Sequence, residues 1–308
     1  MSVKEAEPVL ITALGVVTPW GLGVEALSEG VADDRPLPDP ARCPEVDLKA
    51  HLPSEKTYLD RCSELALLAA SLALQEAGLL DQGYLLACSD GRPFDPDRFG
   101  LSLGTAYGCL DTMNANTQRV QTKGARLASP LLFMHSFINA PASLISIEWG
   151  LRGPAATFTD GAVSFASALL WAEDLLRRRR MDLALVGGVE ALSEPLLRAM
   201  VVEPELARKG VPMEAAAFFL LERASVAQRR GSQPKAEVEK VILAGNRESA
   251  DYPPPSSTEL GGRFAFGAHL ALRLGLVVKA LAQAGPSEAM ELREDEGRRT
   301  AKIELRGV

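Results

Sequence analysis

The residue types that most often carry chemistry in proteins, cysteine and histidine, are few and scattered in this sequence of 308 residues. No two cysteines have the short C-x-x-C spacing typical of a zinc site, and only three histidines stand beside them. The sequence therefore predicts neither a metal site nor a cofactor, and the thiols are expected to be buried and inert. These residues are Cys43, Cys62, Cys88, Cys109, His51, His135 and His269.

Short β-rich runs alternate with longer helical ones along the chain, and this alternation predicts an α/β fold that would position any site. Strands are predicted over 9–15, 98–108, 182–188, 215–222 and 237–245, with a final hairpin that turns near 295–297. Helices are predicted over 61–79, 164–180 and 269–285, where apolar residues recur at helical spacing. The proline-rich stretch 251–262 is predicted to be a loop. No repeat of fixed period is visible, although two broad strand–helix halves are.

Composition and charge exclude several classes of protein. With 33 basic and 40 acidic residues the net charge is −7, so nucleic acid and anionic membranes, which require a basic face, are not expected partners. No run approaches the roughly 18 uncharged apolar residues of a membrane span. The first residues lack the apolar stretch of a signal peptide. Because few cysteines in a large chain fit a reducing compartment, we expect a cytoplasmic protein.

Several motifs in a fixed order resemble the β-ketoacyl synthases, which are thiolase-fold condensing enzymes of fatty-acid and polyketide assembly. The opening VLITALGVVTPWGLG is similar to theirs. The similarity is strongest across 129–192, where GLRGP, a strand, a small-residue turn, a helix and GGVEA follow in the family's order; it is patchy beyond Glu222. The resemblance implies one layered α/β/α/β/α thiolase-like unit, made of an N-terminal half (9–222) and a shortened C-terminal half (237–308).

The nucleophile that the resemblance implies is missing. In active members the strand after GLRGP ends in a turn with a cysteine at the start of the next helix, and this cysteine takes the acyl chain. Backbone N–H groups and the helix dipole favour a thiolate and a developing oxyanion there. Here Ala162 falls on that position, and a methyl group cannot attack a thioester. The nearby hydroxyls of Thr159 and Ser164 lack an adjacent base.

Asp160, two residues before Ala162, is predicted to cap the following helix by accepting from its first N–H groups. The alternative is a role in contact with substrate, although its charge would oppose another anion at that position.

The resemblance also implies two histidines and a lysine from the C-terminal half, and these are largely absent. The His-Gly-Thr-Gly-Thr motif is missing. His269 is the one match to the second histidine, but Ala268 interrupts its Gly-His pair and Phe264 stands near the lysine position. A second alignment sets FAFGAHLAL against the family's Gly-Phe-Gly-Gly loop, and the last hairpin carries DEGRR where an active synthase has that gating loop. We therefore expect a condensing-enzyme fold without condensing chemistry, with His269 as a structural residue.

By the same resemblance the chain looks like a chain length factor. This subunit of type II polyketide and aryl-polyene synthases lacks the cysteine and forms a heterodimer with an active ketosynthase. It would shape the acyl tunnel in polyketide, polyene or fatty-acid biosynthesis. Residues 107–139 match the segment that crosses the dimer contact, and Phe133, Met134 and Phe137 are predicted to line the tunnel or the interface. Thr159 and Asp160 are further candidates, and the alternative for the three apolar residues is an ordinary core position.

Four consecutive arginines are candidates for docking an acidic acyl carrier protein: Arg177, Arg178, Arg179 and Arg180. Cations at a helix C-terminus are also expected without any partner, because they oppose the helix dipole, and a subunit of charge −7 would leave carrier binding mainly to its partner. Two other functions remain open. One is residual malonyl-carrier decarboxylation, which needs oxyanion donors but no nucleophile; the other is a homodimeric scaffold that binds acyl carriers.

Overall fold

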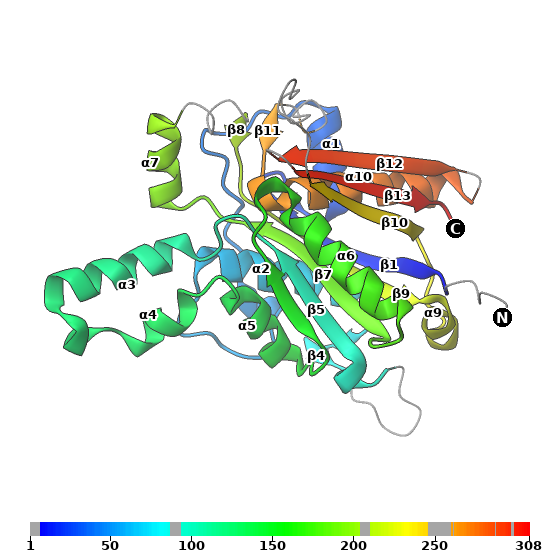
Figure 1. Cartoon of the computed structure of the whole chain (residues 1–308), viewed down its shortest axis with the longest axis horizontal. Helices are drawn as coiled ribbons and strands as arrows, with labels where there is room; N and C mark the ends of the chain where they lie inside the picture. Colours follow the sequence, from blue (N-terminus) through cyan, green and yellow to red (C-terminus); the bar gives the residue numbers. More distant parts are fainter. Residues whose placement is uncertain are drawn as a thin grey trace.

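The computed structural model describes residues 7–86, 94–203, 210–245, 260, 262–286, 288–296 and 299–308, which form a mixed α/β architecture (Figure 1). The strands are β1 (Val9–Thr18), β2 (Gly21–Leu22), β3 (Leu80–Asp81), β4 (Tyr84–Leu85), β5 (Phe99–Gly104), β6 (Ala155–Phe158), β7 (Leu183–Glu190), β8 (Val211–Pro212), β9 (Ala215–Arg223), β10 (Ala236–Gly245), β11 (Arg263–Phe264), β12 (Ala289–Glu296) and β13 (Arg299–Arg306). The α-helices are α1 (Gly23–Ala32), α2 (Arg61–Glu76), α3 (Leu110–Lys123), α4 (Pro130–His135), α5 (Ala140–Trp149), α6 (Ser164–Arg177), α7 (Glu194–Val202), α9 (Ala224–Arg230) and α10 (His269–Ala284). Short 3-10 turns are η1 (Leu48–Ala50), η2 (Pro96–Arg98), η3 (Ala125–Leu127), η4 (Gly161–Val163) and η6 (Phe266–Ala268).

One mixed sheet forms the backbone of the fold, with its strands in the order β12-β13-β10-β1-β9-β7-β5-β6 and with β2 paired to β1. β7, β5 and β6 run parallel, whereas the other neighbours along this order are antiparallel. Every residue of β1, β7 and β9 is buried. Strands that are covered on both faces have such continuous apolar runs, which explains their sequences.

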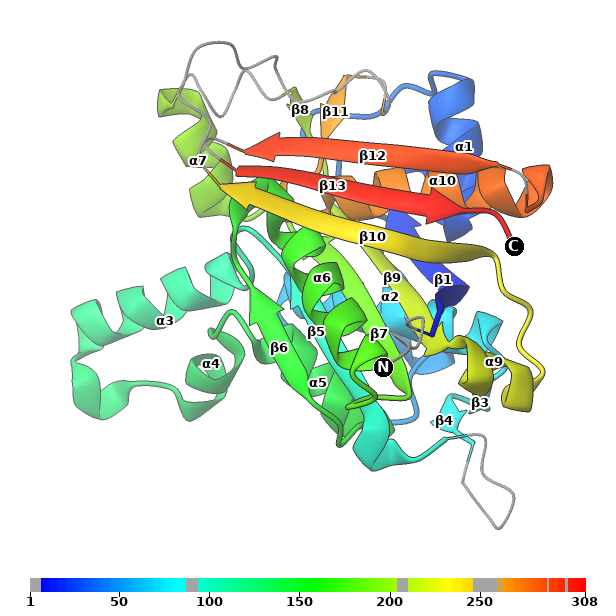
Figure 2. The same cartoon turned by 45° about the vertical axis from the view of Figure 1, so that its right-hand side comes forward.

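Two apolar cores lie on opposite faces of β1, β9, β7 and β5. One core is formed with α2 and α5. The other is formed with α1, α6 and α10, and α6 and α10 also pack against β10, β13 and β12. The helices α6 and α10 therefore separate the larger part of the sheet from its three C-terminal strands, as Figure 2 shows. The molecule is layered.

The strand order is repeated within the chain. β1-β9-β7 is an antiparallel series, and β10-β13-β12 is a second series with the same order. Each half places a 3-10 turn before its central helix, and the residue before that turn has the same backbone angles in both: φ −111° and ψ 30° at Asp160, φ −111° and ψ 31° at Ala265. The next residue is left-handed in both halves, with φ +66° at Gly161 and +42° at Phe266. The C-terminal half is thus a shorter copy of the N-terminal one.

The two halves differ at the edge of the sheet. In the N-terminal half β7 pairs with β5, and β5 pairs with β6. Among the described residues no strand pairs with the corresponding edge of β12. Residues 246–265 alone separate β10 from η6, which is too short a connection for two strands and their crossovers. The predicted shortening of the C-terminal half is therefore located at this edge.

The outward face of the three C-terminal strands is polar. Along β13, Ala301, Ile303 and Leu305 are buried against the helices, while the alternate residues face outward. Lys302 lies 2.8 Å from both Glu291 and Glu304 on that outward face. This alternation is typical of a sheet with one solvated face.

The predicted elements are confirmed with boundary shifts of a few residues. Gly78, with φ +64°, follows the end of α2 as expected for a helix stop. Cys43, Cys62 and Cys109 are buried free thiols. Cys88 and most of the predicted loop 251–262 lie outside the described residues. Within the described part of the chain, no helix is long and apolar enough to span a membrane.

Candidate functional site

Ala162 lies in the elbow between β6 and α6, which is where the sequence places it. It is 1% exposed, in the 3-10 turn η4. Gly161 precedes it with φ +66°, a conformation that favours glycine and that turns the chain sharply into the helix. The elbow therefore has the local geometry that would present a nucleophile at a helix N-terminus, but it presents a methyl group.

The prediction that Asp160 caps α6 is wrong. Its side chain makes no capping hydrogen bond. One carboxylate oxygen accepts from Ser167 Oγ at 2.6 Å, and the other forms an ion pair with Arg299 of β13. The carboxylate is drawn to these two donors and away from the first N–H groups of the helix. The exposed Thr159 precedes it.

Ser164 is fully buried and is used structurally. The Asp160 N–H donates to Ser164 Oγ at 2.8 Å. Ser164 Oγ lies 2.6 Å from the carbonyl oxygen of Gly161 and 3.1 Å from that of Thr105. Its hydroxyl hydrogen is directed at backbone carbonyls that hold the elbow together. The expectation that this hydroxyl does not replace the nucleophile agrees with these contacts.

An apolar cluster fills the space in front of Ala162. Its buried members are Ala162, Leu192, Leu196, Phe264 and Phe266. The rings of Phe264 and Phe266 meet edge to face with centroids 5.1 Å apart, and Tyr107 meets Phe266 at 5.4 Å. Such aromatic packing surrounds the methyl of Ala162 with apolar side chains among the described residues. The elbow is closed by hydrophobic side chains.

His269 begins α10 and is fully buried. Its ring packs against that of Phe264, with centroids 4.8 Å apart. In the repeated architecture His269 occupies the place in η6–α10 that Ser164 occupies in η4–α6. The structure thus brings His269 to the same cluster as Ala162, with Phe264 packed against its ring.

Glu190, at the end of β7, organises the loops around this cluster and was not singled out as a site residue from the sequence. Its carboxylate accepts the N–H groups of Ala106 at 2.7 Å, Tyr107 at 3.1 Å, Gly108 at 3.3 Å and Gly267 at 3.1 Å. Complete burial raises the pKa of Glu190 to about 7, against the lowering effect of these donors. The signal in the sequence is an acidic residue that ends a wholly apolar strand.

The apolar residues predicted for a tunnel or an interface lie on an arm away from the elbow. This arm comprises α3, η3 and α4, and it projects from the sheet in Figure 1. Phe133, Met134 and Phe137 are 53%, 62% and 48% exposed, so the alternative that they are core residues is excluded. The rings of Phe133 and Phe137 pack edge to face with centroids 4.8 Å apart.

The arm also has an unusual charge. Between Asp111 and Glu148 the sequence contains no acidic residue, while it contains Arg119, Lys123 and Arg126. This segment therefore carries a charge of +3 on a chain of net charge −7, and the arm, whose helix α3 also contains Asp111, carries about +2.

Three of the four arginines proposed for carrier docking make contacts within the chain. Arg177 donates to Glu173 at 2.5 Å and to the carbonyl oxygens of Val238 and Glu239 in β10 at 3.0 Å. Arg178 pairs with Asp174 at 2.7 Å, and Arg179 lies 3.4 Å from Glu7. Arg180 is exposed. Arg177 thus joins α6 to the C-terminal strands, and a docking role for these residues stays a prediction.

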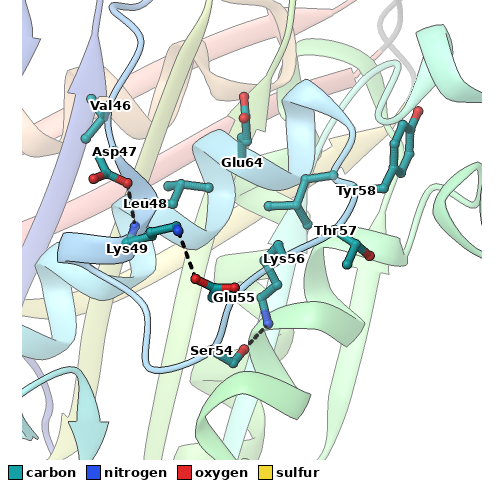
Figure 3. Close-up of a pocket in the computed structure, with 11 residues that line it drawn as sticks. Val46, Asp47, Leu48, Lys49, Ser54, Glu55, Lys56, Thr57, Tyr58 and Glu64 are labelled. Atoms are coloured by element: carbon teal, nitrogen blue, oxygen red, sulfur yellow. Dashed lines mark hydrogen bonds and ion pairs between the residues drawn. The ribbon is translucent and has the colours of Figure 1, made fainter.

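A polar cavity of about 310 Å³ lies in the loop between η1 and α2 (Figure 3). Lys49 pairs with Glu55 at 2.8 Å across it, and Lys56 donates to Ser54 Oγ at 2.6 Å and pairs with Glu148. Both lysines of the lining therefore already face carboxylates. The lining includes no residue of the elbow. The described residues contain no cluster suited to a metal ion.

Comparison with known proteins places this arrangement in a family. The model of the β-ketoacyl synthase N-terminal domain matches residues 39–215. The chain is 26% identical over 306 residues to the tetracenomycin polyketide synthase ketoacyl synthase alpha subunit of Streptomyces glaucescens, with 87% of this chain and 70% of that protein covered. It is 30% identical over 200 residues to nodulation protein E of Rhizobium leguminosarum bv. trifolii, with 61% of this chain and 47% of that protein covered.

Solved structures share the fold. A type II polyketide synthase ketosynthase, in complex with its acyl-carrier protein, matches with a TM-score of 0.80 and 15% identity over 98% of this chain and all of that one. The ishigamide ketosynthase/chain length factor matches with a TM-score of 0.78 and 21% identity over 98% of this chain and 99% of that one. The thiolase-like fold expected from the sequence is confirmed. The chain belongs to the β-ketoacyl synthase family.

Proposed function

We propose that this chain is a non-catalytic, chain-length-factor-like subunit that pairs with an active ketosynthase in type II polyketide assembly. The observation that carries the proposal is the elbow, where Ala162 occupies the nucleophile position and is 1% exposed behind Phe264 and Phe266. Covalent transfer of an acyl chain requires a thiolate or an activated hydroxyl at this point. Neither is present at Ala162, and the nearby Ser164 hydroxyl is bonded to the backbone.

The backbone N–H groups near Ala162 are already bound within the chain, and this favours the non-catalytic proposal over residual decarboxylation. An enolate or a tetrahedral intermediate is stabilised by N–H donors that are aimed at the developing oxyanion. The N–H groups of Ala106, Tyr107 and Gly267, which lie beside the apolar cluster, already bind the carboxylate of Glu190. Donors that hold an internal carboxylate are not open to a substrate.

Two exposed features favour pairing with another subunit. The arm presents Phe133, Met134 and Phe137 to solvent, and exposed apolar patches of this kind mark interaction sites. β6 ends the sheet in the described chain and so presents an edge for pairing. Ile147 of the neighbouring helix α5 is 75% exposed. A partner that covered the arm and β6 would bury these groups.

The ishigamide ketosynthase/chain length factor, and the ketosynthase solved with its acyl-carrier protein, have the fold of this chain. By analogy with these two structures, we expect an active ketosynthase to bind this subunit. The acyl carrier protein would then dock mainly on that ketosynthase. This chain would then form part of the wall against which the growing acyl chain is held.

Co-expression with the cysteine-bearing synthase encoded nearest to this chain tests the proposal. We expect a one-to-one complex in native mass spectrometry. The double variant Phe133→Ser/Phe137→Ser should reduce the amount of co-purified synthase at least tenfold, because it removes the exposed aromatic pair. Tyr84→Ser is the matched control, since Tyr84 is 62% exposed on β4 and lies outside the arm.

A chain that forms no complex with the synthase would overturn the proposal and favour the homodimeric scaffold. Release of an acetyl thioester from a malonyl thioester by the purified chain, above background, would favour the decarboxylase. Equal loss of co-purification in the double variant and in the Tyr84 control would show that the arm is not the contact.

A further inference from the structure

Among the described strands, β12 is unpaired on the side away from β13, and an apolar groove lies beside this edge. The groove encloses about 410 Å³ between α10 and β12 and is lined by Arg273, Leu276, Val277, Ala280, Met290, Glu291 and Leu292. Leu276, Val277 and Ala280 of α10 are only half-buried, and Met290 is 36% exposed. No strand in the described part of the chain pairs with this edge.

The repeat within the fold indicates what kind of element fits here. In the N-terminal half the corresponding edge, that of β7, is paired with β5. β5 also covers the central helix α6, and Ser102 Oγ of β5 donates to the Ala168 carbonyl oxygen at 2.9 Å. At β12 the matching position beside the central helix α10 holds no described strand. An added strand would occupy the place that β5 has in the N-terminal half; β5 runs parallel to β7, whereas the same strand of a second copy would run antiparallel to β12.

The charges along β12 determine which strand can pair. Glu291, Arg293 and Asp295 alternate in sign on the outward face, and charges on an edge strand normally prevent indiscriminate pairing. In two copies joined by a two-fold axis normal to the sheet, this alternation selects the register. An axis at Leu292 sets Glu291 of each copy opposite Arg293 of the other.

Neighbouring registers are disfavoured. An axis at Glu291 or at Arg293 places that residue opposite its own copy, which brings like charges together. An axis at Glu294 brings two inward carboxylates together, each of them already 2.8 Å from its own Arg273. Among these registers, only the one centred on Leu292 sets no like charges directly opposite each other.

The inward side chains fit the same register. Leu292 and Met290 lie on the face of β12 that meets α10. With the axis at Leu292, the two leucines lie side by side, and Met290 of each copy lies opposite Glu294 of the other, whose carboxylate is paired with Arg273. The pairing would therefore join the two edges at an apolar leucine pair, beside the two grooves, while the outward charges match.

We propose that the free edge of β12 is a docking surface for a second copy of this chain, paired antiparallel about Leu292. β12 and β6 are at opposite ends of the sheet order. This contact is therefore separate from the pairing with an active ketosynthase, and the two together would give an assembly in which two copies of this chain join two active subunits.

The test is the association of the purified full chain, measured by sedimentation velocity over a concentration series. We expect a dimer for the wild-type chain. Glu291→Arg and Arg293→Glu should each raise the dimer dissociation constant at least tenfold, because each sets like charges across the axis. The double variant Glu291→Arg/Arg293→Glu should restore the wild-type dissociation constant, because the charges are complementary again.

Glu304→Arg is the matched control. It makes the same charge change on the same outward face, but on β13, which is paired on both sides. A monomeric wild-type chain would overturn the proposal, and so would a dimer whose dissociation constant is equal in Glu291→Arg and Glu304→Arg. Failure of the double variant to restore association would also overturn it. The complex with the active synthase is scored separately by co-purification, so the two proposals can fail independently.

Discussion

Replacing Glu190 by glutamine should change how the stability of the fold depends on pH. The folded pKa of Glu190 is raised to about 7 from the ordinary 4.5, and the largest cause is burial. The unfolded chain therefore loses this proton at a lower pH than the folded chain does. The stabilising contribution is fully present below pH 4.5 and is lost as the pH rises through 7.

The size of the effect follows from the two pKa values. A difference of about 2.5 pH units at about 1.4 kcal/mol per unit gives about 3 kcal/mol, of which about 2 kcal/mol falls between pH 5.5 and pH 8. The glutamine side chain of the variant would not titrate. The difference in free energy of unfolding, wild type minus variant, should thus fall by about 2 kcal/mol across this range.

Urea unfolding followed by circular dichroism, at half-unit steps from pH 5.5 to pH 8, measures this difference. Glu25→Gln is the control, because Glu25 is exposed in the first turn of α1 and its replacement removes the same charge. The reasoning is refuted if the wild-type-minus-variant difference stays level or rises with pH. In that case the four N–H donors, and not burial, would dominate, and Glu190 would be ionised throughout.

Three further predictions concern the elbow and its supports. Ala162→Cys should give no more condensation product than the wild type, because the family's histidine and lysine partners are missing. The assay supplies an acyl carrier and a malonyl carrier and detects the products by mass spectrometry. Measurable condensation would contradict the loss of catalysis. Arg299→Ala removes the ion pair with Asp160, and because Arg299 is half-exposed the free energy of unfolding should fall by less than about 1 kcal/mol in urea titrations. Gly104→Ala would place a Cβ 2.5 Å from the backbone nitrogen of Phe165. This clash should lower the free energy of unfolding by about 1–3 kcal/mol, visible as a lower Tm. An unchanged Tm would show that α6 can move away from β5.

The strands and long helices could be predicted from the sequence because their signals are local. The buried strands are continuous apolar runs, and α2 is bounded by the Asp60 cap, whose side chain accepts from the Cys62 N–H at 2.8 Å, and by Gly78. The position of Ala162 followed from the order of motifs along the chain. These features depend on residues within a few positions of one another.

The contacts that decide the site could not be predicted, because they join distant residues. Asp160 was expected to be a cap, but it pairs with Arg299, which is 139 positions away. Glu190 binds N–H groups more than 70 positions away in both directions along the chain. The exposure of Phe133 and Phe137 likewise depends on α3 and α4 projecting from the sheet, which a pattern of polar and apolar residues does not specify.

The acid-free segment between Asp111 and Glu148, which includes most of the arm, makes the molecule an electric dipole. If the segment between Asp111 and Glu148 carries +3 and the chain carries −7, the rest of the molecule carries −10. An approaching protein with a negative surface would be repelled by most orientations of this chain and attracted by the one that leads with the arm. The orienting torque would act over about a Debye length, about 8 Å at physiological ionic strength. Encounter would therefore begin at the arm, and added salt would slow that encounter more than it would loosen the completed contact.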